Sequence, residues 1–320
     1  MVEAPRTAAK WTVEPRAPHV RRFGGATHVG PPWVAKDKDN EDFVFYLEMP
    51  VDDEPWVLAG VADGVSSATW SARGARHASA AFIETFDWFC RQASFPRTEE
   101  QLKERAWGPL MAREYHRSVR ERLEADRRFL LEGRHIDPSW SPDFYTRKYL
   151  SGPQGLSDTE AWFQSTLLAV ALGPNGGFAL LLGDGFVRVD RRYGDGSWEC
   201  ARSIEAQTRP GHVVSLSLTQ AEVFACLARL APRGAAEIGV LLATDGVSNS
   251  TEEGLERAFA GLGVHEATGA GHPLDRVVLK SSHECRGALE RLAALPKELI
   301  DPDNMSLAFA ARALGDGRLR

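Results

Sequence analysis

Residues 40–64 read NEDFVFYLEMPVDDEPWVLAGVADG, two short apolar stretches on either side of a segment rich in Pro and Asp. The stretches FVFYLEM (43–49) and WVLAGVAD (56–63) contain many aromatic and β-branched residues, which favour strands. The residues between them, 50–55, are typical of a turn. The segment therefore predicts a β-hairpin with one carboxylate just before its first strand, Asp42, and one at the end of its second, Asp63.

Further secondary structure is expected on both sides of a long irregular stretch. Helical spacing of apolar residues predicts two helical segments, 71–90 and 99–131. Apolar runs separated by Asn-Gly and Asp-Gly dipeptides then predict an antiparallel meander over 163–172, 178–190 and 197–204. Beyond it we expect a helix over 219–230, a buried strand over 238–245, helices over much of 251–298 and a closing strand over 305–312.

These blocks of strands and helices, joined by hairpin turns rather than regular βαβ units, predict an α+β fold with antiparallel sheets. Residues 1–22 contain three prolines among Arg and Ala and show no period, so we expect a flexible N-terminal arm. Residues 23–320 are expected to form a single domain. Within it, the Gly- and Pro-rich stretch 132–160 is interpreted as a loop or flap.

Composition excludes several classes of function. With 320 residues, 43% of them apolar and 26% charged, the chain is expected to be globular. The net charge of -6 provides no global basic field, so no nucleic acid partner is expected. No run approaches the roughly 18 apolar residues of a membrane span, and we expect no membrane association and no signal peptide. The four cysteines form no CxxC pair, which favours a reducing cytoplasm over zinc binding or disulfides.

Acidic residues recur where predicted strands begin or end. A single one is usually a turn residue, but here they recur: Asp42, Asp63, Asp184, Asp245 and Asp303. Three of them precede Gly, which lets the backbone bend tightly and present a carbonyl oxygen. Oxygen ligands without His or Cys pairs suit Mg²⁺, Mn²⁺ or Ca²⁺ rather than Zn²⁺. Carboxylates gathered at one end of a sheet repel each other, and divalent cations relieve that repulsion.

Six motifs together resemble the protein phosphatase 2C family, and a bacterial-type member in particular. They are NED (40–42), GVADGVSS (60–67), QSTLLAVAL (164–172), LLLGDGFVRV (180–189), LLATDGVSN (241–249) and DNMSLAF (303–309). Their order and spacing match the family, and the resemblance runs from about residue 24 to residue 312. It implies an αββα sandwich, two antiparallel sheets flanked by helix pairs, and makes residues 23–320 one phosphatase-like catalytic domain.

The resemblance also implies a site with two Mn²⁺ or Mg²⁺ ions at one edge of the sandwich. Asp42, Asp245 and Asp303 would flank one metal. Asp63 would bridge both metals, and the carbonyl of Gly64 would bind the other. Asp42, Asp63, Asp245 and Asp303 are accordingly the expected catalytic residues.

Other positions are carried over from the same family. Glu41 would hold metal-bound water. Asp184 and Asn249 match a third-metal position, and because Asn249 stands where the family usually has an acidic residue, the third ion is expected to be weak or absent. The Arg that the family places five residues before its first metal Asp is missing, so Lys36 or Lys38 is expected to bind phosphate as a point charge.

The implied activity is hydrolysis of phosphoserine or phosphothreonine on a protein by a metal-activated water. The implied partner is a phosphorylated protein, such as a Ser/Thr kinase. An alternative is a catalytically weak relative that binds a phosphoprotein without turnover, since the His that follows DG in many members is Val65 here. A third possible activity is hydrolysis of small phosphoesters. The acidic residues of DKDNED (37–42), together with Glu48, also resemble the ligands of a helix-loop-helix calcium site. Asp42, however, stands at the loop position where that motif requires Gly.

Overall fold

The computed structural model describes residues 21–34, 40–65, 68, 70–131, 163–201, 219–264 and 272–314. The arm predicted at 1–22 falls outside these ranges except for its last two residues, which begin a strand. The flap predicted at 132–160 lies outside them. No helix within the described ranges combines the length and apolar character needed to cross a bilayer.

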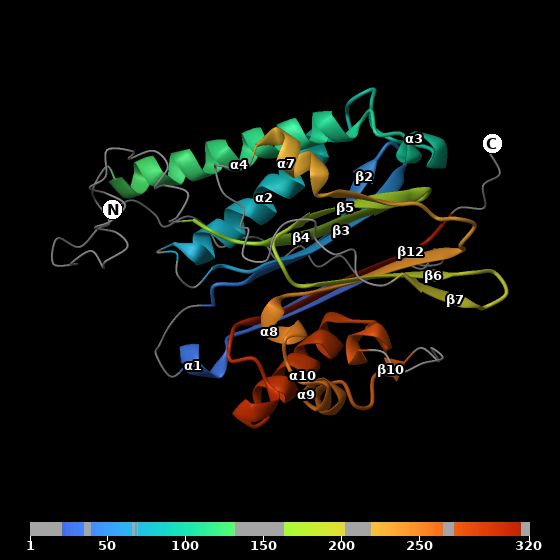
Figure 1. Cartoon of the computed structure of the whole chain (residues 1–320). Helices are drawn as coiled ribbons and strands as arrows, with labels where there is room; N and C mark the ends of the chain where they lie inside the picture. Colours follow the sequence, from blue (N-terminus) through green and yellow to red (C-terminus); the bar gives the residue numbers. More distant parts are fainter. Residues whose placement is uncertain are drawn as a thin grey trace.

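Two five-stranded antiparallel sheets form the centre of the molecule (Figure 1). The first runs in the order β2 (Phe43–Val51), β3 (Glu54–Ala62), β4 (Leu167–Gly173), β5 (Gly176–Leu182), β8 (Leu227–Leu230). The second runs in the order β1 (Arg21–His28), β12 (Met305–Ala313), β9 (Glu237–Ala243), β6 (Phe186–Arg192), β7 (Trp198–Ala201). A small hairpin pairs β10 (Gly263–Val264) with β11 (Val277–Val278).

Helices cover the outer face of each sheet, which confirms the αββα sandwich (Figure 1). On the first sheet lie α2 (Ser71–Phe89) and α4 (Gly108–Leu131), with α3 (Glu99–Lys103) and α7 (Gln220–Ala225) beside them. On the second lie α9 (Glu252–Ala258) and α10 (Ser282–Ala293). The remaining short elements are α1 (Pro31–Val34), α8 (Asp245–Ser248) and the 3₁₀ turns η1 (Pro273–Asp275) and η2 (Lys297–Leu299).

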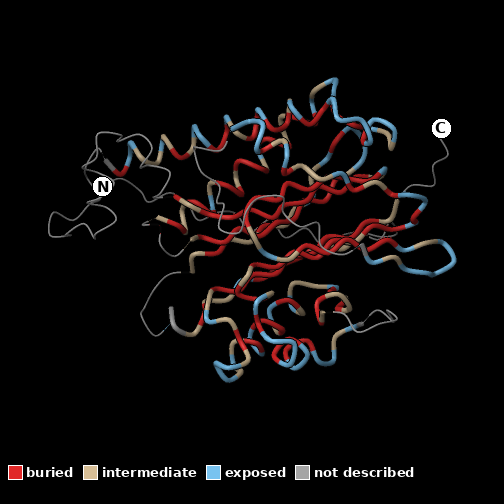
Figure 2. Tube along the Cα trace, in the orientation of Figure 1, coloured by how far each residue is buried: buried red, intermediate tan, exposed pale blue. Residues whose placement is uncertain are grey.

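Three apolar layers hold the sandwich together. One fills the space between the sheets, and Val61, Val170 and Leu242 are among its members. The other two lie between each sheet and its helices. Figure 2 shows buried residues running along both sheets, with exposed residues on the outer turns of the helices and on the β6–β7 loop. Alternate residues of a strand face opposite sides, and the inner strands of both sheets are covered on both sides, so they are buried along most of their length. The edge strands β1, β2 and β8 keep several partly exposed residues.

The predicted hairpin is confirmed, but its turn is shorter than expected. Asp52 and Asp53 alone form the turn, and Pro50 pairs with Pro55 inside the strands. Proline is tolerated there because β2 is an edge strand and β4 joins β3 only from Val57 onward. Asp52 takes a positive φ of 51°, a conformation that Asp adopts more readily than most residues.

Two helix predictions need correction. The helix expected over 219–230 ends at Ala225, and Leu227–Leu230 forms β8 instead. A capping box between Thr219 and Glu222 starts the helix. Residues 227–230 then pair with β5 as the edge strand of the first sheet. This long-range pairing overrides the local helical pattern. The segment 99–131 is two helices, α3 and α4, separated at residues 104–107.

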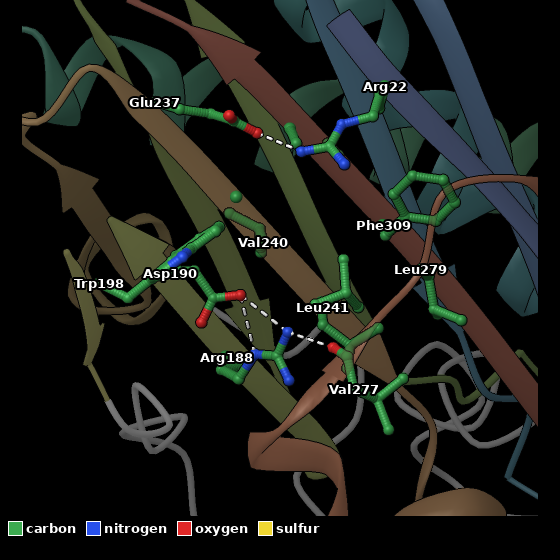
Figure 3. Close-up of a pocket in the computed structure, with 14 residues that line it drawn as sticks. Arg22, Arg188, Asp190, Trp198, Glu237, Val240, Leu241, Val277, Leu279 and Phe309 are labelled. Atoms are coloured by element: carbon green, nitrogen blue, oxygen red, sulfur yellow. Dashed lines mark hydrogen bonds and ion pairs between the residues drawn. The ribbon is translucent and has the colours of Figure 1, made fainter. Parts of the chain in front are cut away.

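A buried ion pair fastens the loop after β10 to the outer face of the second sheet. Arg188 donates to Oδ2 of Asp190 from Nε at 3.0 Å and from Nη2 at 2.8 Å, and its side chain is only 3% exposed. The same guanidinium donates to the carbonyl oxygen of Val277 at 2.6 Å (Figure 3) and to that of Leu274. These contacts fix the position of residues 273–278 over β6. The hollow drawn in Figure 3 lies beside this pair.

Candidate metal centre

Asp42 and Asp63 lie at the same end of the β2–β3 hairpin. Phe43, the first residue of β2, pairs with Ala62, the last residue of β3, so the carboxylates directly flank the final rung of the ladder. Both residues are buried, Asp42 at 6% exposure and Asp63 at 8%. A buried carboxylate is costly unless a hydrogen-bond donor, a proton or a cation compensates it. The first sheet thus brings two such groups to one edge.

Asp245 and Asp303 occupy the corresponding end of the second sheet. Asp245 opens α8 directly after β9, and Asp303 lies two residues before β12. The backbone N–H of Thr244 donates to the carbonyl oxygen of Ser306 at 3.0 Å, which sets the two strand ends side by side. Both aspartates are partly exposed, so they form the solvent side of the cluster.

A threonine that sequence reasoning missed connects the two sheets at this edge. The hydroxyl of Thr244 donates to Oδ2 of Asp42 at 3.1 Å and accepts from the backbone N–H of Ser306 at 2.9 Å. Thr244 is 1% exposed, so these hydrogen bonds are shielded from water. The available signal was a polar residue inside an otherwise apolar strand end, directly before Asp245.

The carboxyl groups interact with each other across the edge. Asp63 lies within hydrogen-bonding reach of both Asp42 and Asp245, and the charge of Asp303 acts on all three. Burial is the largest cause of a raised pKa in each case, and it lifts the pKa of Asp42 to about 7. The pKa of Asp63 is raised well above its ordinary value, first by burial and then by the charges of Asp42 and Asp245.

The predicted water-holding residue and carbonyl ligand lie beside these carboxylates. The hydroxyl of Ser71, the first residue of α2, donates to Oε1 of Glu41 at 2.8 Å. A Cβ at Gly64 would lie 2.6 Å from the carbonyl oxygen of Glu41 and 2.8 Å from the carbonyl carbon of Ser71. Only glycine permits this approach of backbone to backbone. The Gly64 position is therefore tied to Glu41 and to the start of α2.

The loops that carry the other two carboxylates touch through their backbones. A Cβ at Gly246 would lie 2.0 Å from the carbonyl oxygen of Asn304. The side chain of Asn304 in turn accepts from the backbone N–H of Gly30 at 3.2 Å. This packing leaves no freedom to move Asp245 away from Asp303 without breaking buried contacts.

Comparison with known proteins gives this geometry a context. The family model of protein phosphatase 2C matches residues 29–271, which is most of the chain. The chain belongs to the protein phosphatase 2C family. No curated protein matches the sequence.

Several solved structures are similar to this chain at low sequence identity. Serine-threonine phosphatase 2C from Toxoplasma gondii is 13% identical with a TM-score of 0.50, covering 93% of this chain and 100% of that one. The catalytic domain of serine threonine protein phosphatase PstP in complex with two manganese ions is 16% identical, with a TM-score of 0.48 and coverage of 93% and 100%. PppA of Pseudomonas aeruginosa is 18% identical, with a TM-score of 0.45 and coverage of 92% and 98%.

The carboxylate and carbonyl oxygens at this edge of the phosphatase 2C fold suit divalent cations that prefer oxygen ligands. Oδ1 of Asp42 is buried and receives no hydrogen bond from a described donor. The Asp63 carboxyl lies within hydrogen-bonding reach of the Asp42 carboxyl. Two acceptor groups in such contact need a proton or a cation between them. In the part of the chain that the structure describes, no three His, Cys, Asp or Glu side chains are grouped as a bound ion would group them.

The remaining predicted residues have more peripheral positions. Asp184 lies in the β5–β6 turn, partly exposed, and its charge contributes to raising the pKa of Asp245. Asn249 is exposed at the end of α8, and its backbone N–H donates to the carbonyl oxygen of Asp245 at 2.8 Å. Lys36 and Lys38, the predicted phosphate contacts, lie outside the described residues.

The raised pKa values predict an unusual pH dependence for the metal-free protein. Because the pKa of Asp42 rises from 3.8 to about 7 on folding, the folded state binds more protons than the unfolded state between those values. The contribution of this group to stability is complete below about pH 4 and is lost as the pH rises through about 7. We expect a lower urea midpoint in EDTA at about pH 8 than at about pH 5.5.

The variant Asp42→Asn separates this effect from other titrating groups. The midpoint of Asp42→Asn should change less between the two pH values than that of the unmodified chain, and Mn²⁺ should raise the unmodified midpoint most at about pH 8. Equal pH dependence in both proteins would contradict the assignment.

Proposed function

We propose that this chain is a metal-dependent protein serine/threonine phosphatase that hydrolyses phosphoserine and phosphothreonine. The observation that carries the proposal is that four strand ends of two sheets bring Asp42, Asp63, Asp245 and Asp303 to one edge of the sandwich. There the buried carboxyl of Asp63 lies within hydrogen-bonding reach of Asp42. Nothing in the folding of the sandwich requires two buried carboxyls to face each other. Such an arrangement costs stability unless a ligand compensates it, which is characteristic of functional sites.

In the proposed centre, Asp42, Asp63, Asp245, Asp303 and the Gly64 carbonyl would hold two Mn²⁺ or Mg²⁺ ions. When bound, the ions would supply an activated water and neutralise charge on the phosphoryl group.

Other residues of the chain would set the geometry. Thr244 orients Asp42, and Ser71 orients Glu41, through hydrogen bonds of 3.1 Å and 2.8 Å. Glu41 would hold water at the centre, and Asp245 and Asp303, which are partly exposed, would face the phosphate. Asp184 and Asn249 would hold at most a weak third ion.

The proposed substrate is a phosphorylated protein, and the proposed partner is a Ser/Thr kinase. Lys36 or Lys38 would contact the phosphate. All four cysteines are unbridged, which supports a reducing compartment, and we propose the cytoplasm.

The test compares hydrolysis of a phosphothreonine peptide and of p-nitrophenyl phosphate, each with and without Mn²⁺, in the unmodified chain and in Asp245→Asn. We expect Mn²⁺-dependent release of phosphate that falls by about 10²-fold or more in Asp245→Asn, the size of effect that follows loss of one preorganised electrostatic contact. A higher kcat/KM for the peptide supports the protein substrate. Mn²⁺ binding without turnover would favour a phosphoprotein-binding relative, and preference for the small ester would favour a phosphoesterase.

A further inference from the structure

A second feature lies far from the carboxylates, at the other end of the helical layer over the first sheet. The turn between α3 and α4 and the turn between α7 and β8 enclose a cavity of about 220 Å³. Figure 1 shows α3 and the start of α4 at one end of this layer. The metal-site end of the layer is marked by the ion pair between Arg73 of α2 and Asp126 of α4. Asp126 lies 18 residues along α4 from the cavity, or about 27 Å at 1.5 Å per residue.

The floor of the cavity is aromatic and held in place. Trp107 is 4% exposed, and its ring packs against that of Phe178 with centroids 5.2 Å apart. The ring of Phe224 lies on the backbone of Gly108, where a Cβ would come within 2.4 Å of it. Leu227 adds a further apolar wall. A rigid, partly apolar hollow of this kind can bury one large side chain of a ligand.

The rim of the cavity is positively charged. Arg105 and Arg229 are its charged lining residues, and both are exposed. Among the described residues, neither pairs with a carboxylate, although most other arginines of the helical layer do. Arg229 donates to the carbonyl oxygen of Lys103, which holds its guanidinium over the α3–α4 turn. Two cations beside a partly apolar hollow with an aromatic floor are complementary to an anionic ligand with an apolar anchor.

The size of the cavity selects among such ligands. Pockets for whole small molecules span roughly 300–1,000 Å³, so this one suits a single side chain. A bare phosphate would leave the aromatic floor exposed to water. We propose that this cavity is a docking site for a segment of a partner protein in which an aromatic or large aliphatic residue is flanked by Asp or Glu. The apolar side chain enters the hollow, and the flanking carboxylates meet Arg105 and Arg229.

The experiment measures binding of labelled peptides to the full chain by fluorescence polarisation in the absence of substrate. The probe is acetyl-Glu-Glu-Phe-Glu-Glu-amide, with peptides that replace Phe by Gly or all Glu by Lys as controls. We expect a Kd of about 0.1–1 mM for the probe, and weakening of about tenfold in Arg105→Glu and in Arg229→Glu. Arg113→Glu is the matched variant, because Arg113 is an exposed residue of α4 that does not line the cavity.

Three outcomes would overturn the proposal: no saturable binding up to about 5 mM, equal binding of the Lys or Gly peptide, or equal weakening by Arg113→Glu. The last would mean non-specific charge attraction. Because binding is read without turnover, the result is independent of the proposed phosphatase activity. Hydrolysis of p-nitrophenyl phosphate should be the same in Arg105→Glu and in the unmodified chain, since the cavity is remote from the carboxylates.

Discussion

Replacing Asp63 by Asn is expected to lower phosphatase kcat/KM by about 10³-fold or more and to abolish tight Mn²⁺ binding. Asp63 is the central member of the cluster, because its carboxyl is within hydrogen-bonding reach of both Asp42 and Asp245. An amide keeps the shape but removes the charge that would offset two cations. Loss of one preorganised electrostatic contact alone costs about 10²–10³-fold, and here the ligand shared by both proposed ions is lost.

The measurement pairs calorimetric titration of Mn²⁺ with steady-state kinetics on a phosphothreonine peptide. Asp63→Asn should also raise the stability of the metal-free protein at about pH 8, because a buried carboxylate flanked by other charges is removed. Asp195→Asn is the matched control, since Asp195 lies in the exposed β6–β7 turn away from the cluster. Retained activity and Mn²⁺ stoichiometry in Asp63→Asn would refute the role of Asp63 as a shared ligand.

Replacing Arg188 by Ala is expected to cost about 3–5 kcal/mol of unfolding free energy, the usual effect of breaking a buried ion pair. The substitution leaves Asp190 buried without its cation and removes the donor to the carbonyl oxygens of Leu274 and Val277. The loop they belong to also carries His272, whose ring stacks on Phe186 with centroids 5.5 Å apart. That loop should loosen in the variant.

Urea denaturation at neutral pH measures this loss, with Arg192→Ala as the control. Arg192 is on the same strand but half exposed, and its contacts are an ion pair with Glu237 at 4.0 Å and a contact with the Trp198 ring. A long pair whose arginine is half exposed contributes about 0–1 kcal/mol, and Glu237 keeps its ion pair with Arg22 when Arg192 is removed. Similar losses in both variants would show that the buried pair has no special contribution.

Local patterns in the sequence predicted the β2–β3 hairpin, the strands β4, β9 and β12 and the positions of the acids. They did not predict β1 or β8, and the expected meander over 163–204 is divided between the two sheets. Runs of aromatic and β-branched residues, Asp-Gly dipeptides and the Pro- and Asp-rich cluster at 50–55 are local signals, and they sufficed for the hairpin and for the aspartates that flank strand ends. The order of the motifs indicated the family and with it the αββα sandwich. The sequence also shows a glycine at position 64, where the structure brings the backbone close to that of Glu41 and Ser71.

Which groups lie together, and how strongly they shift each other's pKa, depends on packing between distant segments. The hydrogen bond from Thr244 to Asp42 joins residues 202 positions apart, and the conversion of 227–230 into a strand depends on the free edge of β5. Arg105 and Arg229 share a cavity although 124 residues separate them. Burial, pKa and cavity shape arise from packing between distant segments, and no local pattern of residues encodes them.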